Sequence, residues 1–393
     1  ASFLLPASRV FEETISLLRG PLRDPGAAYA VDERARARAL LQKVSGRVSG
    51  SQLRSAAEVQ SSLSQDQVLL QYRVHGEGID LWILSSTGLR FVEISQPLNE
   101  LEQRVSQWRE SIERGFRSPL GAELGSLLLG PAAGELASCQ QVIVVANTPL
   151  SRAPFALLQL DGEYLLQRHA VSFELSGSIR CALLRRKALQ EGREGLLAVG
   201  YDGGNAARSL RLRELPFAET EARMVEAAAP SGRILLGADA TANRVADLLP
   251  VVGVLHLAAH AGLDEFGEPF ILLAPQGQGD GLMRGEQLSA WPLKDVSLVT
   301  LAGCETAQLG SSQVQGDLSS LGASIFAGGS RDLIASLWSV GDDSTMKLMA
   351  SFYRELFESR RPPVQALRHA QLELARSNGT LEREWGAFCF FGP

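Results

Sequence analysis

The spacing of apolar residues changes along the chain, and each spacing predicts a different kind of element. Residues 8–20 and 31–46 carry apolar side chains at helical intervals, with Pro21 and Pro25 expected to end the first helix. Residues 67–95 instead form three short β-rich runs separated by the turn sequences HGEG and SSTG. This pattern predicts a helical lead-in followed by an antiparallel meander.

From about residue 195 the pattern becomes strand, helix, strand. Apolar runs such as VVGVLHLAAH and DVSLVTLAGC alternate with amphipathic segments such as ELPFAETEARMVEAAA. This alternation predicts an α/β fold with a mainly parallel sheet flanked by helices. A chain of 393 residues is long enough for two or three domains. We therefore expect three parts, namely a helical N-terminal segment at 1–64, a supporting α/β lobe at 65–194 and a larger α/β domain at 195–393.

Composition narrows the classes of protein to which the chain could belong. Apolar residues make up 45% and charged residues 21%, which is typical of a globular protein. The formal net charge of −6 argues against a nucleic-acid binder, because such proteins need a surplus of basic side chains. No apolar stretch is long enough to cross a membrane, and the N-terminus lacks the basic flank of a signal peptide. The missing initiator Met suggests a trimmed chain.

The four cysteines are far apart and form no zinc-spaced cluster, so we expect reduced thiols in a cytoplasmic protein without a metal or other cofactor. Cys304 stands at the end of one predicted parallel strand and His260 at the end of another. Ligands bind beyond the carboxyl ends of such strands. A cysteine there becomes a nucleophile when a histidine takes its proton. The alternative is that both side chains only pack in the core.

The other cysteines and His256 are weaker candidates for a catalytic role. His256 lies inside its strand, on the same face as His260 by the period of two, and is expected to be structural. The remaining cysteines have no histidine close in sequence, so we interpret Cys139, Cys181 and Cys389 as packing residues.

Several separated motifs resemble the CHAT family of caspase- and separase-like cysteine peptidases. They include HLAAHAGLDEFG, LVTLAGCETAQLG, GASIFAGGSRDLIASLWSVGDDSTMKLMASFYREL and the ending ALRHAQLELARS…WGAFCFFG, and the similarity covers roughly residues 65–393. The resemblance implies a caspase-like sheet preceded by a pseudo-protease-like lobe, with a dyad of His260 and Cys304. It also implies an oxyanion hole formed by the backbone N–H groups of Ala261 and Cys304. The family usually has glycine at position 261, so alanine is a departure.

The same resemblance predicts where substrate binds. Ser336 and Trp338 would line the cleft, with Asp342 and Asp343 near its mouth, where their acidic side chains could attract a basic P1 residue. A medium-sized apolar P1 residue is the competing expectation. Burial of Trp338 in the core and capping of a helix by Asp342 are the alternatives. We also expect a regulatory element at 201–214 or at 308–316.

These features favour a regulated cysteine endopeptidase that cleaves a protein substrate. By resemblance it would act in bacterial signalling or antiphage defence, including gasdermin activation, under the control of an activating partner or an upstream protease. The main alternative is a catalytically silent CHAT module that serves as a scaffold. A small-molecule hydrolase is weakened because the chain contains no G-x-S-x-G sequence.

Overall fold

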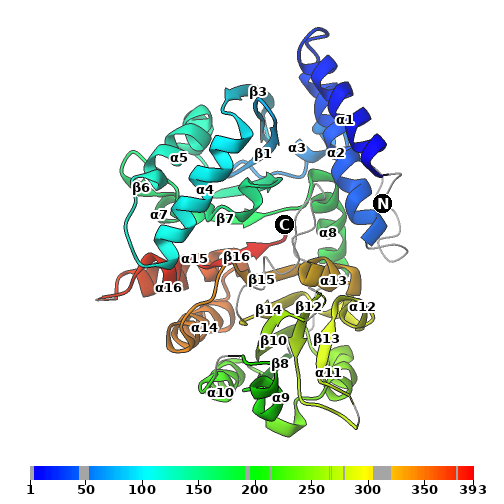
Figure 1. The fold of residues 1–393 in the computed structure, drawn as a ribbon, viewed down its shortest axis with the longest axis vertical. Coiled ribbons are helices and arrows are strands. Elements are labelled where there is room, and N and C mark those ends of the chain that lie inside the picture. Colours follow the sequence, from blue (N-terminus) through cyan, green and yellow to red (C-terminus); the bar gives the residue numbers. More distant parts are fainter. Residues whose placement is uncertain are drawn as a thin grey trace.

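In the computed structural model, one sheet of eleven strands runs through the described part of the chain, with helices on both faces (Figure 1). The strand order is β3-β2-β1-β4-β7-β16-β15-β14-β10-β8-β9. The structure describes residues 4–43, 53–190, 195–212, 215–264, 266, 268–277, 279–303, 320–377 and 379–393.

The first part of the sheet contains the predicted meander. Its strands are β1 (Gln67–His75), β2 (Gly78–Ser85), β3 (Gly88–Ser95), β4 (Gln141–Ala146) and β7 (Ala170–Phe173). β1, β2 and β3 pair antiparallel, whereas β1, β4 and β7 are parallel. A short hairpin around Asp161–Gly162 is formed by β5 (Gln159–Leu160) and β6 (Glu163–Tyr164).

The second part of the sheet is the predicted parallel block. Its strands are β8 (Leu196–Tyr201), β9 (Gly232–Leu236), β10 (Val254–Ala259), β14 (Leu298–Leu301) and β15 (Asp332–Ser336). The last strand, β16 (Phe388–Phe391), runs antiparallel to β15 and parallel to β7. The carboxyl ends of β10, β14 and β15 therefore lie at the same edge of the sheet as the amino end of β16.

Helices cover the two faces of this sheet (Figure 1). One face carries α4 (Leu98–Glu113), α5 (Leu120–Leu129), α7 (Leu165–Arg168), α10 (Ala218–Ala228), α14 (Asp342–Phe357), α15 (Pro363–Ala375) and α16 (Glu382–Trp385). The other carries α1 (Leu4–Arg19), α2 (Pro25–Lys43), α3 (Ala56–Gln60), α8 (Gly177–Gln190), α11 (Ala242–Leu248), α12 (Gly285–Ser289) and α13 (Ser320–Gly328). The helices α6 (Ala133–Leu136) and α9 (Gly204–Ser209) are short connections, and a small second sheet holds β11 (Ala261–Leu263), β12 (Pro269–Leu272) and β13 (Leu282–Arg284).

The N-terminal helices differ from the sequence expectation at one proline. Pro25 was expected to end a helix, but it is the first residue of α2, where proline's missing N–H costs no hydrogen bond. Asp24 precedes it and accepts a hydrogen bond from the backbone N–H of Ala27. The second helix therefore begins six residues earlier than its apolar spacing indicates.

Carboxylates from α2 fasten the lead-in to the rest of the fold. Buried Glu33 accepts hydrogen bonds from the N–H groups of Gly177 and Ser178, at the start of α8. Burial raises the pKa of Glu33. Asp32, on the same helix, pairs with Arg36 at 2.7 Å and accepts from Gln71 of β1.

One hydrophobic cluster spans both sides of the expected boundary at 194/195. It includes Leu70 and Val144 from the first part and Leu255 and Leu301 from the second. A smaller cluster lies beneath the N-terminal helices and contains Ile15 and Trp82. The two α/β parts therefore share one sheet and one core. The division of the chain into three parts stays a proposal.

Candidate active site

The candidate site lies where the neighbouring strands β10 and β14 end. The two strands are parallel, and each residue of β10 pairs with the residue 44 positions later in β14, as in His256 with Thr300. A Cβ added at Gly303 would stand 2.4 Å from the carbonyl oxygen of Ala259 and 3.3 Å from the nitrogen of Ala261. The chain just beyond β14 therefore lies against the residues on either side of His260.

His260 follows β10 directly, and its imidazole is held by the loop after β8. Its Nε2 lies 3.1 Å from the carbonyl oxygen of Asp202. Because a carbonyl only accepts, Nε2 carries the hydrogen and Nδ1 keeps its lone pair. The backbone carbonyl of His260 accepts from the N–H of Leu272, which fixes the main chain on β12.

Burial sets the protonation of this histidine. The side chain is 5% exposed. Loss of solvation lowers the pKa of His260 below the usual value, while the Asp202 carbonyl and the charge of Asp342 partly oppose that shift. A lowered pKa keeps the imidazole neutral at pH 7, which is the form that can accept a proton.

Residues 202 and 203 lie against the imidazole of His260, and the sequence gives no direct sign of this contact. Every residue has a backbone carbonyl, so no residue type marks Asp202 as the partner of His260. Gly203 has φ +88°, and an added Cβ would come within 2.8 Å of His260 Cδ2 and 2.4 Å of Ala207 Cβ. The Gly-Gly pair at 203–204 was the only signal in the sequence, and it indicates only a turn.

Gly203→Ala should displace the imidazole of His260, and a reaction that uses this imidazole as a base should slow by about tenfold to a hundredfold, since small misplacements of a catalytic group are costly. Gly204→Ala is the matched control. Gly204 is also left-handed, at φ +48°, but its added Cβ would meet only the Tyr201 hydroxyl, at 3.5 Å. Turnover and thermal midpoints of both variants check this expectation, and equal kcat values for both would contradict it.

Alanine at position 261 fits the backbone found there. Ala261 begins β11 and lies opposite Ile271 of β12, and its φ is not positive. The N–H of Leu272 donates to the carbonyl of His260, so these two residues form a hydrogen-bonded pair of the ladder. By the alternation of an antiparallel ladder, the N–H of Ala261 points away from β12. Its nitrogen faces Gly303, so alanine replaces glycine there without backbone strain.

Two of the three predicted substrate-binding residues lie together beside Gly303. Ser336 and Asp342 line a small hollow with Gly303 and Phe388. The hydroxyl of Ser336 donates to the carbonyl of Gly303 at 2.9 Å. Asp342 makes no side-chain cap for α14, and instead accepts from the N–H of Phe217 at 2.7 Å. Burial raises the pKa of Asp342, against the effects of the Phe217 N–H and of His260.

The structure does not bring Trp338 to this hollow. Its side chain is 1% exposed, and its indole N–H donates to the carbonyl of Arg383 at 2.8 Å. Because β15 ends at Ser336, the alternation of a strand no longer directs residue 338 to the same side. The position is that of a core residue.

His256 belongs to a buried polar network between the sheet and the helices α10 and α14. Its Nε2 lies 2.9 Å from Glu221 of α10, and its Nδ1 lies 3.2 Å from the Tyr353 hydroxyl. That hydroxyl donates to Thr300 of β14 at 2.9 Å. The network ties α10 and α14 to the sheet, as expected of a structural histidine.

A Cys–His contact that the sequence did not indicate lies in the first part of the fold. Cys139 Sγ is 3.5 Å from His169 Nδ1, and that nitrogen also lies 3.1 Å from the Cys139 carbonyl. The Sγ–H points to the carbonyl of Leu136 at 3.8 Å. Burial raises the pKa of the Cys139 thiol to about 11, so this thiol is a poor nucleophile at neutral pH.

Cys304 and the 308–316 segment lie outside the described residues. Within the described ranges, no group of three or more His, Cys, Asp or Glu side chains is arranged to hold a metal ion. In the same ranges, no helix is both long and apolar enough to span a membrane.

The CHAT domain family matches residues 118–393. This chain belongs to the CHAT domain family. Two crystal structures of the Saccharomyces cerevisiae separase–securin complex resemble the CHAT chain, with TM-scores of 0.61 and 0.59 and 10% identity. Each match covers 95% of this chain and 34% of the matched chain, so this chain spans about a third of that length. No curated protein matches the sequence.

The Arg-specific cysteine proteinase gingipain R also resembles the CHAT chain, with a TM-score of 0.45, 9% identity and coverage of 75% of this chain and 74% of that chain. At such identities a likeness shows the fold alone. The fold is the caspase-like α/β fold found in separase, as the sequence motifs predicted.

Proposed function

We propose that this CHAT chain is a cysteine endopeptidase in which His260 and Cys304 form the catalytic dyad. The observation that carries the proposal is the pairing of β10 with β14. Paired residues are 44 positions apart, and Cys304 follows His260 by the same 44 positions. Cys304 comes directly after Gly303, which lies against Ala259 and Ala261. Consecutive Cα atoms are about 3.8 Å apart, and we propose that the chain beyond Gly303 brings the thiol of Cys304 to the imidazole.

The hydrogen bond of His260 supports one assignment of the proton transfers. Nε2 is held by the Asp202 carbonyl, so Nδ1 is the base that takes the thiol proton. The sulfur of Cys304 attacks the substrate carbonyl carbon and forms a C–S bond. The imidazolium then protonates the leaving amine as the C–N bond breaks, which leaves a thioester. Water, deprotonated by His260, hydrolyses the thioester and restores the thiol.

Backbone N–H groups would stabilise the oxyanion formed during attack. The nitrogen of Ala261 faces Gly303, which supports its role as one donor, and the N–H of Cys304 would be the second. No cofactor is needed for these steps, because the nucleophile, the base and the donors all come from this chain.

The segment between β8 and α10 holds two residues of the proposed site. At its start the Asp202 carbonyl binds His260, and at its end the Phe217 N–H binds Asp342. Within the segment 201–214, where a regulatory element was expected, residues 204–209 form the short helix α9. We propose that activation acts through this segment, because moving it would release both the base and the acidic side chain.

Asp342 is the residue that would select a basic P1 side chain, since its carboxylate lies in the hollow next to Gly303. Asp342→Asn should lower kcat/KM for arginine peptides by about tenfold and leave leucine peptides unchanged. Asparagine keeps an oxygen that can accept from Phe217. Asp343→Asn, which alters an exposed carboxylate paired with Lys347 at 2.5 Å, is the control. Equal turnover of arginine and leucine peptides by wild type and Asp342→Asn would contradict selection of a basic P1 side chain by the charge of Asp342.

The substrate and cellular setting are proposals drawn from the family. We place the chain in the cytoplasm, cleaving a protein substrate in bacterial signalling or antiphage defence, including gasdermin activation. Separase in the matched structures is bound to securin. We propose that this chain likewise works with a protein partner or an upstream protease.

A panel of fluorogenic peptides that differ at P1 tests the proposed activity. Turnover that is lost when the thiols are alkylated supports the cysteine peptidase. Failure to hydrolyse any peptide, with every activator tried, would instead favour the silent CHAT scaffold.

A further inference from the structure

A pocket of about 410 Å³ lies between α4, α7, α15 and α16, separate from the hollow beside Gly303. Its wall is apolar where Ile112, Leu166, Leu372 and Trp385 meet. At its rim Phe116 is 66% exposed and Leu381 is 39% exposed, so the apolar surface continues out of the cavity. Exposed apolar surface of this kind is typical of a binding site for another molecule.

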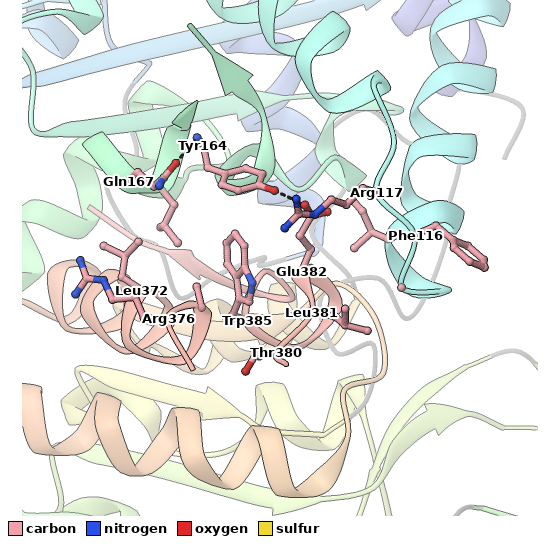
Figure 2. A pocket seen from close by; sticks show the side chains of 14 residues that line it. Phe116, Arg117, Tyr164, Gln167, Leu372, Arg376, Thr380, Leu381, Glu382 and Trp385 are labelled. Atoms are coloured by element: carbon pink, nitrogen blue, oxygen red, sulfur yellow. Dashed lines mark hydrogen bonds between the residues drawn. The ribbon is translucent and has the colours of Figure 1, made fainter. Parts of the chain in front are cut away.

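Arginines flank this apolar wall. Arg117 and Arg376 lie on opposite sides of Trp385 (Figure 2). Arg368 donates to the carbonyls of Leu166 and Gln167, which also line the pocket, and so adds a positive charge next to it. The one acidic side chain in the lining, Glu382, already accepts a hydrogen bond from the Tyr164 hydroxyl. An occupant with negative charge would complement this rim.

The pocket is fixed to the same sheet edge as the proposed active site. Trp385 lines the pocket, and Phe388, three residues later, lines the hollow beside Gly303. Buried Gln371 donates to the carbonyls of both residues, at 2.9 and 3.0 Å. Three residues of chain span at most about 11 Å, so one extended polypeptide could occupy both sites.

We propose that this pocket binds an acidic segment of the substrate protein. An apolar side chain of that segment would pack against Trp385, while neighbouring Asp or Glu side chains would pair with Arg117 and Arg376. Calling the occupant a substrate rests on the proposed peptidase function. The binding site itself does not depend on that function.

Fluorescence anisotropy tests this site on the Cys304→Ala chain, which cannot cleave the probe. The probe is a fluorescein-labelled peptide with a Leu-Phe pair between two glutamates on each side, and a second peptide carries lysines in place of the glutamates. We expect saturable binding of the acidic peptide only, weakening as salt is added. Arg117→Glu and Arg376→Glu should each weaken binding by about fivefold or more.

Arg233→Glu is the matched control, because Arg233 is exposed on the edge strand β9, whereas α7 and α15 of the pocket pack at β7 in the middle of the sheet. It should leave the affinity unchanged. Equal binding of both peptides, or no response to reversal at Arg117 and Arg376, would overturn the proposal. So would self-association of the chain that Arg117→Glu abolishes, since a second copy would then be the occupant. Failure of the peptidase proposal would appear in the turnover assays and would not alter these affinities.

Discussion

Cys304→Ala should abolish peptide hydrolysis and leave the fold intact. The substitution removes the only atom that can form the thioester in the proposed mechanism, so no covalent route remains. Position 304 follows the end of β14 and lies beyond the strand's buried core residues. Turnover of the preferred peptide should fall to background while the thermal midpoint stays close to that of wild type.

Cys389→Ala is the control for this expectation. Cys389 is buried within β16, and burial raises the pKa of its thiol to about 12. Its replacement should lower stability through the small cavity it leaves, with turnover retained. Activity that survives Cys304→Ala but disappears in Cys389→Ala would show that the nucleophile is misassigned.

His260→Ala should lower peptide turnover by at least about 10²–10⁴, the usual contribution of a general acid and base. Without the imidazole, a thiol with an ordinary pKa near 8.5 is only a few per cent ionised at pH 7. The leaving amine would also lack its proton donor. Rates measured under single-turnover conditions would separate this loss from any change in substrate binding.

His256→Ala is the control on the same strand, and its effect should be the reverse. Removing this imidazole leaves the buried carboxyl group of Glu221 without its partner, which costs about 1–3 kcal/mol in the free energy of unfolding. The folded fraction should keep its activity. A stable His256→Ala protein with strongly reduced turnover would mean that the buried network takes part in catalysis.

The sequence predicted the part of the site that depends on strand pattern. Two apolar runs of strand length each end in a reactive side chain. This pattern predicted that His260 and the residues before Cys304 lie at one edge of the sheet. Parallel strands meet at their carboxyl ends, so this prediction needed only strand order. The paired register of β10 and β14, with its offset of 44, agrees with that placement.

The remaining features depend on tertiary packing, which leaves little trace in one sequence. The Asp202 carbonyl that holds His260 is a backbone atom, so no side chain marks it. The contact of Cys139 with His169 joins residues 30 positions apart that precede neighbouring strands. The parallel pairing of β16 with β7, which makes one sheet of the two α/β parts, requires that strands distant in the chain meet.

Trp338 shows where period-two alternation fails. The apolar run continues past Ser336, but the strand does not, and the chain turns the indole towards Arg383. Pro25 shows the same limit for helices, since a proline stops one helix or begins the next according to its position.

Labelling with a peptidyl chloromethyl ketone, followed by mass spectrometry of the digested protein, tests the dyad most directly. The account predicts one equivalent of label, on Cys304, because burial raises the pKa of the thiols of Cys139, Cys181 and Cys389. It also predicts that labelling slows by about 10² or more in His260→Ala. Label on another cysteine, or equal labelling rates in wild type and His260→Ala, would contradict the assignment of His260 and Cys304 as a catalytic pair.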